Sequence, residues 1–245
     1  MTCIANAYKN DGCVSCREHC GVRIALSSRQ KSAQLPADYL DKTLENNPVE
    51  QHFIERHMSA YVDTFARRFE QDGDRIKSLY FYSESPGTGK TTLSAILLNE
   101  WLSRGFIGSV KRGINDKTDA YFMDINEWQS LYNKFNRPGV PQEITESAAR
   151  QYYEKLERAK KASFVVMDDI GVRSSSEAFR ADLHDIINHR TVNNMPTIYT
   201  SNIALSELAQ IYDKRLADRV RDMCLEYVFE GESHRGRREV RHDVQ

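Results

Sequence analysis

The residues with the clearest chemical meaning lie in the stretch SESPGTGKTT, residues 83–92. In it, Gly87 and Gly89 lead into Lys90 and Thr91. Glycine lets backbone N–H groups turn inward around an anion, lysine adds a positive charge, and a threonine hydroxyl can bind Mg²⁺. The helix that follows adds the partial positive charge of its N-terminus. This order of residues indicates a phosphate-binding loop.

The loop departs from the usual pattern at its first position, where Glu84 replaces a glycine. That position lies where the apolar run of residues 78–82 turns into the loop, so we expect it to need only ordinary backbone angles. A strand-to-helix turn without a ligand is the alternative, which the strand and helix patterns on either side disfavour. The residues expected to contact ATP or ADP are Ser85, Pro86, Gly87, Thr88, Gly89, Lys90, Thr91, Thr92 and Asp168.

An acidic pair, Asp168 and Asp169, ends the apolar run SFVVM. A nucleoside triphosphatase needs a carboxylate that binds Mg²⁺ and a second group that orients the attacking water. We expect Asp168 to hold Mg²⁺ together with Thr91, and Asp169 to be the catalytic residue that positions or deprotonates the water. The alternative is a strand followed by a polar turn, which the upstream loop disfavours.

A third polar strand end is Asn202, which follows the run TIYTS at residues 197–201. The carboxyl ends of parallel strands converge on one crevice. Asn202 is therefore a candidate catalytic residue that hydrogen-bonds the γ-phosphate or the attacking water. It could instead cap the next helix, although Ser206 is the better-placed cap.

The composition describes a chain large enough for one full-sized domain and a small appendage. It has 245 residues, 28% of them charged, and a formal net charge of -1, so any basic surface must be local. The apolar runs are too short to span a bilayer, and the N-terminus lacks an apolar signal core. These features predict a soluble, cytoplasmic protein that does not associate with membranes.

Apolar runs alternate with segments of helical spacing from about residue 51 onwards. This alternation predicts an α/β fold in which helices flank a five-stranded parallel sheet, and continuous runs such as FVVM indicate strands covered on both faces. The expected strands are residues 78–82, 120–124, 163–168, 197–201 and 226–231. The expected helices are residues 53–69, 91–105 (ended by Gly105), 125–135, 144–161, 176–192 and 205–223.

These motifs resemble, in their order and spacing, those of the AAA+ replicative-helicase loaders of the DnaC/DnaI type. The motifs that carry the likeness are SPGTGKTT, VVMDDIG, DLHDIINHRTVNNMPTIYTSN and RLADRVRDMCLEYVFEGESHRG. The likeness covers residue 36 onwards and is strongest over residues 79–235. Within the family, the chain most resembles loaders carried by phages and prophages of Gram-positive bacteria. It implies an AAA+ ATPase, slow and stimulated by partners, that binds the hexameric replicative DNA helicase and places it on single-stranded DNA.

The resemblance also implies self-association into a ring or spiral with ATP between neighbouring subunits. An arginine of one subunit then reaches the γ-phosphate held by the next. Arg219 matches this catalytic role, and Arg215, one helical turn away, is the alternative. Both arginines could instead be solvated on an amphipathic helix. After the last strand, Arg235 matches a family arginine, while His234 stands where the family has tyrosine.

The helical segment 144–161 is the candidate for DNA contact, because loaders of this type carry extra helical structure here that lines a pore. Its cations could contact phosphates, and a tyrosine could stack on a base. A surface helix with internal salt bridges explains the same residues as well. The cations are Arg150, Lys155, Arg158 and Lys161.

Four of the five cysteines lie within the first twenty residues, which in a reducing compartment favours a metal site over disulfides. Four thiolates can close a tetrahedral zinc site, and a segment so poor in apolar residues would need metal binding to fold. His19 could replace one cysteine, an iron–sulfur cluster could replace zinc, or the cysteines could be unligated. The expected zinc ligands are Cys3, Cys13, Cys16 and Cys20.

The expected domain division places a cysteine-rich helicase-docking segment with a linker at residues 1–50 and the AAA+ ATPase domain at residues 51–245. Two other functions stay open at this point. One is a related, IstB-like AAA+ regulator of transposition, and the other is an adaptor that binds ATP without hydrolysing it. The cysteine-rich segment and the lack of a transposase-type N-terminal signature favour the loader.

Overall fold

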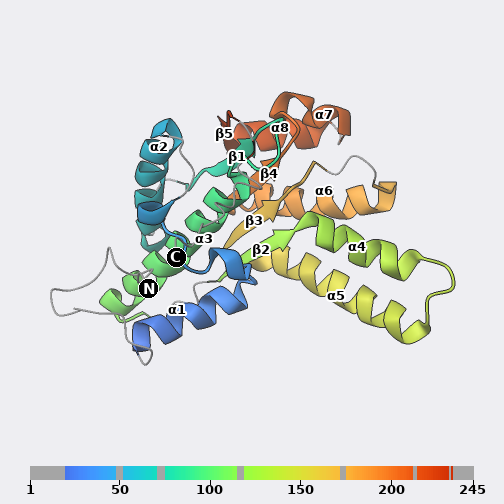
Figure 1. The fold of residues 1–245 in the computed structure, drawn as a ribbon, viewed down its shortest axis with the longest axis horizontal. Helices are drawn as coiled ribbons and strands as arrows, with labels where there is room; N and C mark the ends of the chain where they lie inside the picture. The colour runs from blue at the N-terminus through green and yellow to red at the C-terminus, as the bar shows by residue number, and fades with distance from the viewer. Residues whose placement is uncertain are drawn as a thin grey trace, which may run out of the picture.

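The computed structural model describes residues 20–47, 52–70, 75–114, 119–171, 175–211, 214–231 and 233. The strands are β1 (Ser78–Tyr82), β2 (Ala120–Asp124), β3 (Phe164–Asp168), β4 (Thr197–Ser201) and β5 (Cys224–Val228). They form one parallel sheet in the order β2-β3-β4-β1-β5, with helices on both faces (Figure 1). The predicted α/β fold with a five-stranded parallel sheet is therefore confirmed.

The inner strands are almost entirely buried because both of their faces are covered. The first four residues of β1, β3 and β4 are all buried, as continuous apolar runs predict. The register pairs Asp124 with Asp168, and Tyr82 with Ser201. The carboxyl ends of these four strands thus lie together, and polar side chains that follow them converge at one edge of the sheet.

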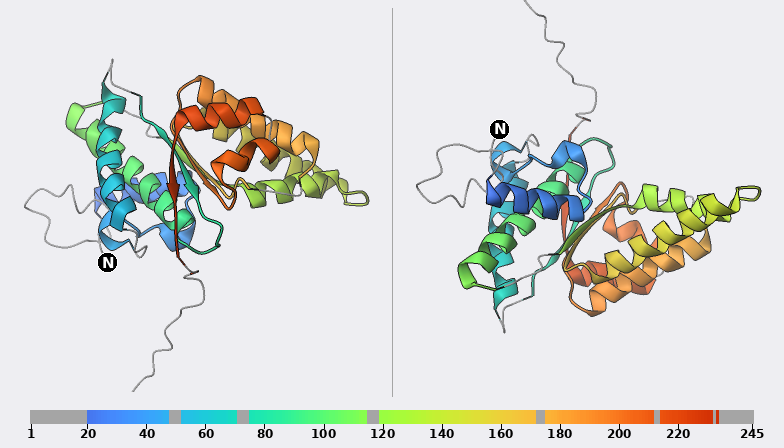
Figure 2. Two further views of the ribbon diagram at one scale, coloured as in Figure 1. Left: turned by 90° about the horizontal axis from the view of Figure 1, so that it is seen from above. Right: turned by 90° about the horizontal axis from the view of Figure 1, so that it is seen from below.

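One face of the sheet is covered by α1 (Gly21–Ser32), α2 (His52–Asp63) and α3 (Lys90–Arg112). Figure 2 shows these helices on one side of the sheet and the remaining helices on the other. Aromatic side chains fill this first side. Trp101 stacks on Phe164 with ring centroids 4.8 Å apart, and Phe65 meets both rings edge-on. α3, the helix that follows the glycine-rich loop, is therefore fixed firmly against the sheet.

The other face carries α4 (Ile125–Asn136), α5 (Gln142–Lys161), α6 (Glu177–Val192), α7 (Leu208–Ile211) and α8 (Lys214–Met223). α4 and α5 form a hairpin that extends away from the sheet (Figure 1). Trp128 of α4 stacks on Tyr152 of α5 with ring centroids 4.6 Å apart. The Tyr152 hydroxyl donates to Asp182 of α6 at 2.6 Å. The base of the hairpin is thus fixed to the body of the protein.

The segment that follows α1 packs on the same body. Buried Ala33 and Leu35 join the core beside α3, and the Ala33 carbonyl accepts the N–H of Phe122 on the outer side of β2. Gln30 of α1 hydrogen-bonds Asn99 of α3 at 2.8 Å, and both side chains are buried. The described residues up to 47 are therefore packed against the sheet, while the domain division at residue 50 stays a prediction.

The helix after the loop does not end at Gly105, as the sequence predicted. It continues to Arg112, and Gly113 ends it with a φ of 64°. Gly105 is buried inside the helix, and burial of this face outweighs the cost of an interior glycine, about 1 kcal/mol. Gly108 is favoured by packing, because a Cβ atom there would clash with the Phe69 ring. Neither α3 nor any other described helix is long and apolar enough to cross a membrane.

Two predicted elements near the C-terminus also differ in the structure. The last strand runs from Cys224 to Val228, so it begins two residues and ends three residues earlier than predicted. The helix predicted for residues 205–223 divides into the 3₁₀ turn Leu205–Glu207, α7 and α8. Ser206 lies inside that turn, whose N-cap is Ala204, so it does not cap a helix.

Candidate functional site

The glycine-rich loop joins β1 to the N-terminus of α3. Gly87 and Gly89 have φ values of 77° and 98°, a region that glycine adopts without strain. Glu84 is not among the described residues with positive φ, which confirms that its position needs only ordinary backbone angles. The departure from the usual pattern at Glu84 therefore leaves the glycine turns of the loop intact.

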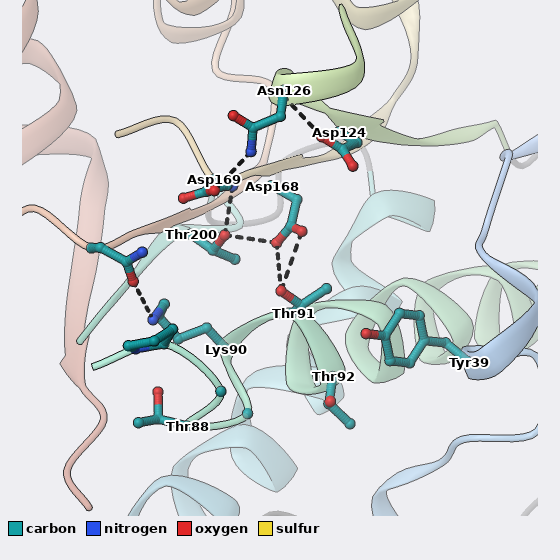
Figure 3. A pocket seen from close by; sticks show the side chains of 14 residues that line it. Tyr39, Thr88, Lys90, Thr91, Thr92, Asp124, Asn126, Asp168, Asp169 and Thr200 are labelled. Carbon is teal, nitrogen blue, oxygen red and sulfur yellow. Dashed lines mark hydrogen bonds between the residues drawn. The ribbon is translucent and has the colours of Figure 1, made fainter. Parts of the chain in front are cut away.

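A cavity of about 510 Å³ opens at the loop and the carboxyl edge of the sheet (Figure 3). It brings together most of the predicted site residues from five separate segments. The described residues that line it are Tyr39, Pro86, Gly87, Thr88, Gly89, Lys90, Thr91, Thr92, Asp124, Asn126, Asp168, Asp169, Thr200 and Asn202. Ser85, the remaining predicted contact residue, does not line the cavity.

Lys90 lies buried at the cavity, with oxygen atoms around its ammonium group. Its Nζ donates to Oδ1 of Asn202 at 2.8 Å, and to the carbonyls of Ser83 and Ser85 at 3.4 and 3.3 Å. The Oγ1 of Thr88, in the same loop, is buried without a hydrogen-bond partner in the described part of the chain. Buried polar atoms are normally paired, so an unpaired hydroxyl and a cation in one loop fit an anionic ligand.

Asp168 lies between two threonine hydroxyls. Its Oδ1 accepts from Oγ1 of Thr200 at 2.7 Å and from Oγ1 of Thr91 at 3.0 Å. Burial raises the pKa of Asp168, the two threonine hydrogen bonds oppose that rise, and the carboxylates of Asp124 and Asp169 add to it. A divalent cation would stabilise this buried negative charge, and oxygen ligands are those that Mg²⁺ prefers. Thr91 and Asp168 therefore fit a Mg²⁺ site.

Asp169 is held in an uncommon backbone conformation, with a φ of 61°. Its backbone N–H donates to Oγ1 of Thr200 at 2.8 Å, and its Oδ2 accepts from Nδ2 of Asn126 at 2.8 Å. Figure 3 shows both contacts beside Asp168. Strained backbone of this kind persists where surrounding contacts determine it, which is common at functional sites.

Four residues of the cavity were not predicted from the sequence: Tyr39, Asp124, Asn126 and Thr200. Asn126 follows the end of β2, so the strand-end argument that identified Asp168 would also have found it. Thr200 lies within an apolar run, where a threonine is an ordinary strand residue. Tyr39 lies in a segment without helical or strand periodicity, and its only signal is its aromatic side chain.

Other predicted residues lie outside the cavity. Arg215 and Arg219 are exposed on α8 and do not line it, so a role toward a neighbouring subunit stays a prediction. His234 and Arg235 lie outside the described residues.

The cysteine cluster is described only at its last member. Cys3, Cys13 and Cys16 lie outside the described residues, and the part of the chain that is described contains no group of three or more metal-ligating side chains. Cys20 precedes α1, and the backbone N–H of Arg23 is the main contact that lowers the pKa of its thiol. A thiolate at Cys20 is therefore favoured by the helix that follows it.

The cations of α5 are partly engaged within the molecule. Lys155 pairs with Glu127 of α4 at 3.3 Å, and the guanidinium of Arg158 lies 4.6 Å from the ring centroid of Tyr121. Tyr152 is fully buried and cannot stack on a base, whereas the neighbouring Tyr153 is 55% exposed. Salt bridges within the protein account for some of these cations, and DNA contact through this helix stays a prediction.

Comparison with known proteins gives a consistent set of relatives. No protein-family model matches the sequence. The chain is 25% identical over 173 residues to the replicative helicase loader DnaC of Escherichia coli K12, a region that covers 70% of this chain and 62% of DnaC. A crystal structure of DnaI has a TM-score of 0.57 at 23% identity, over 84% of this chain and 100% of that chain.

A structure of AMPPCP-bound DnaA from Aquifex aeolicus has a TM-score of 0.53 at 18% identity, over 80% of this chain and 51% of that chain. The parallel sheet flanked by helices is thus a fold that this chain shares with DnaI and with part of DnaA. The chain is similar in sequence to a replicative helicase loader, DnaC, and shares its fold with DnaI and with about half of the DnaA chain.

Proposed function

We propose that this protein is an ATP-dependent loader that binds the replicative DNA helicase and delivers it onto single-stranded DNA. The observation that supports this most is the convergence of Lys90, Thr91 and Asp168 on one cavity, in a chain similar to DnaC. The sheet positions a cation, a hydroxyl and a carboxylate as a triphosphate with Mg²⁺ requires. The similarity to DnaC supports the use of this site in helicase loading.

Each polar group of the cavity has a task in this proposal. The loop N–H groups and Lys90 hold the phosphates, while Thr91 and Asp168 hold Mg²⁺, which neutralises phosphate charge. Asp169 orients or deprotonates the attacking water. Asn202, whose Oδ1 is 2.8 Å from Nζ of Lys90, would hydrogen-bond the γ-phosphate or that water.

We expect slow hydrolysis that partners stimulate. In most members of the AAA+ class, which the motifs of this chain resemble, glutamate stands at the position of Asp169, and aspartate is one methylene shorter. One oxygen of Asp169 is also held by Asn126 of α4. The carboxylate must therefore reach further to a water, or be released from α4, before it assists hydrolysis.

Neighbouring subunits would complete the site. Arg219, exposed on α8, would reach the γ-phosphate in the next subunit of a ring or spiral, with Arg215 on the same helix as the alternative. For single-stranded DNA, the exposed Arg150 and Lys161 of α5 would contact phosphates. Both roles are consistent with side chains that point to solvent in one subunit.

We also propose that the first fifty residues dock the helicase and that Cys3, Cys13, Cys16 and Cys20 bind Zn²⁺. Four thiolates suffice for a closed tetrahedral site, and the lowered pKa of Cys20 favours its metal-binding form. Elemental analysis of the purified protein tests this. One zinc per chain would support it, and a trace amount would reject it.

ATP hydrolysis by the wild type, Lys90→Ala and Asp169→Ala, with helicase and single-stranded DNA present, tests the catalytic part. We expect both variants to lose most of the activity, with ATP binding retained in Asp169→Ala. Equal rates in all three would leave an adaptor that binds ATP without hydrolysing it.

Co-purification in the presence of ATP tests the partner. We expect the full-length chain to retain the replicative helicase, and Lys90→Ala to retain less of it. Recovery of a recombinase without a helicase would point to a regulator of transposition instead.

A further inference from the structure

Tyr39 is an aromatic side chain in the cavity wall that has no part in the proposed phosphate and Mg²⁺ contacts. It ends the 3₁₀ turn Ala37–Tyr39 in the segment after α1. Figure 3 shows its ring beyond Thr92, across the cavity from Lys90, with the hydroxyl end directed inward. Among the described residues that line the cavity, it is the one aromatic side chain.

Two buried amides hold the backbone around Tyr39. Asn99 of α3 donates to the carbonyls of Tyr39 and Lys42, both at 2.9 Å. Gln30 of α1 donates to the Leu40 carbonyl and to Oδ1 of Asn99, both at 2.8 Å. Because both amides are at most 3% exposed, losing a partner would be costly. The turn is thus anchored to the helix that follows the phosphate-binding loop.

The cavity is larger than a phosphate chain alone requires. Its volume of about 510 Å³ lies within the range of about 300–1,000 Å³ found for small-molecule pockets. Phosphates held by the loop would direct the rest of an extended nucleotide away from Lys90, toward Thr92 and Tyr39. An aromatic ring there is suited to the flat face of a nucleobase.

We propose that Tyr39 packs against the base of the bound nucleotide, and that Asn99 and Gln30 are positioning residues that hold it there. This inference rests on the proposed nucleotide site and extends it. The loop and strand ends supply the triphosphate contacts, whereas the segment after α1 supplies the base contact. A nucleotide and a bare tripolyphosphate chain then differ in affinity through Tyr39.

Calorimetry with Mg·ATP and with Mg·tripolyphosphate on the full-length protein tests the base contact. Tyr39→Ala should bind ATP about tenfold more weakly, a typical loss for one aromatic–base contact, while its affinity for tripolyphosphate stays as in the wild type. Tyr39→Phe should keep most of the ATP affinity, because the ring is retained. Leu40→Ala is the matched control, since it truncates the exposed neighbouring side chain and should bind both probes as the wild type does.

The positioning residues need a readout that general loss of stability would not change. Asn99→Leu should lower the ratio of ATP to tripolyphosphate affinity as Tyr39→Ala does, and the double variant should lower it no further. Gln30→Met, which removes one of the two braces, should give a smaller change in the same direction if Asn99→Leu fails to fold.

The outcomes separate this inference from the proposed function. ATP binding by the wild type with an unchanged affinity in Tyr39→Ala would overturn the base contact and leave the phosphate site standing. Equal loss of ATP and tripolyphosphate binding would also overturn it, because Tyr39 would then only support the fold. No binding of either probe by the wild type would overturn the nucleotide site itself.

Discussion

Two buried cations lie at opposite ends of the parallel strands, and their surroundings differ. Arg190 of α6 lies near the amino end of β4 and is fully buried. Lys90 lies near the carboxyl end of β1 and is 8% exposed. The guanidinium of Arg190 donates to Thr197 Oγ1 and to three backbone carbonyls, all at 2.7–2.9 Å. Two of the three hydrogen bonds described for Lys90 are 3.3 Å or longer.

The comparison distinguishes a structural cation from one suited to a ligand. Arg190 ties the end of α5 to the start of β4, and its short bonds use the planar shape of the guanidinium. Burial lowers the pKa of Arg190 to about 10, so it stays charged at neutral pH. Lys90 has two longer bonds to loop carbonyls, and its short bond goes to Asn202, which lines the same cavity. Of these two buried cations, the one beside a cavity is thus the one suited to a ligand.

The largest expected effect is on stability, from Arg190→Met. The substitution leaves four buried acceptors without their donor, which should lower the free energy of unfolding by roughly 4 kcal/mol or more. Chemical denaturation followed by circular dichroism measures this. Arg190→Lys should fall between the variant and the wild type, because one ammonium cannot reach all four acceptors. A change below about 1 kcal/mol in Arg190→Met would break the comparison.

Lys90→Met should change the stability of the ligand-free protein little and should abolish its stabilisation by nucleotide. We expect the free energy of unfolding without nucleotide to stay within about 1 kcal/mol of the wild type, because the bonds lost are mostly long. Mg·ATP should raise the melting temperature of the wild type and leave that of the variant unchanged. Thermal denaturation with and without Mg·ATP compares the two. Severe destabilisation without ligand would show that Lys90 is as structural as Arg190.

Asp168→Asn extends the comparison to a buried carboxyl group whose charge depends on pH. Burial raises the pKa of Asp168, so the ligand-free folded protein keeps the proton of this carboxyl group at pH values where the unfolded chain has lost it. The folded protein therefore loses stability as the pH rises and Asp168 becomes ionised. Mg²⁺ requires the ionised form, so Mg²⁺-dependent ATP binding should weaken as pH falls from neutral. Asp168→Asn should be at least as stable as the wild type at neutral pH and lose the Mg²⁺ dependence. Calorimetry at several pH values checks this, and an undiminished Mg²⁺ dependence in the variant would contradict it.

The smallest effect is expected from Asn126→Ala. Losing one exposed hydrogen bond to Asp169 should cost about 1 kcal/mol of stability or less. Releasing the carboxylate from α4 should raise the ATP hydrolysis rate by a few-fold while ATP affinity stays unchanged. Steady-state hydrolysis measures this, with Ser130→Ala on the exposed side of α4 as the control. A hydrolysis rate equal to that of the wild type would show that Asn126 does not limit catalysis.

The sheet could be predicted because its strands are covered on both faces, which leaves continuous apolar runs in the sequence. Helix ends were less predictable, since Gly105 reads as a stop but lies buried within α3. The loop residues and Asp168 could be predicted because their spacing follows from phosphate chemistry.

The rest of the site depends on contacts between distant segments. Thr200 and Asn126 reach the acidic pair from 32 and 43 residues away, and their types alone are ordinary for a strand and a helix start. Tyr39 depends on packing of the N-terminal segment against α3, which no periodic pattern announces. Thr200 and Tyr39 could be predicted only once the packing of these segments was known, whereas Asn126 follows the end of a predicted strand.

The contact between Ala33 and Phe122 has a consequence for how the protein can be shortened. It covers backbone of β2 that would otherwise be open to strand pairing with another molecule. β5, at the other end of the sheet, already exposes Leu225 and Val228. A fragment that starts at residue 51 would also open the edge of β2, so that neither edge strand of the described sheet would have a described neighbour on its outer side, and molecules with two such edges can join into chains and precipitate.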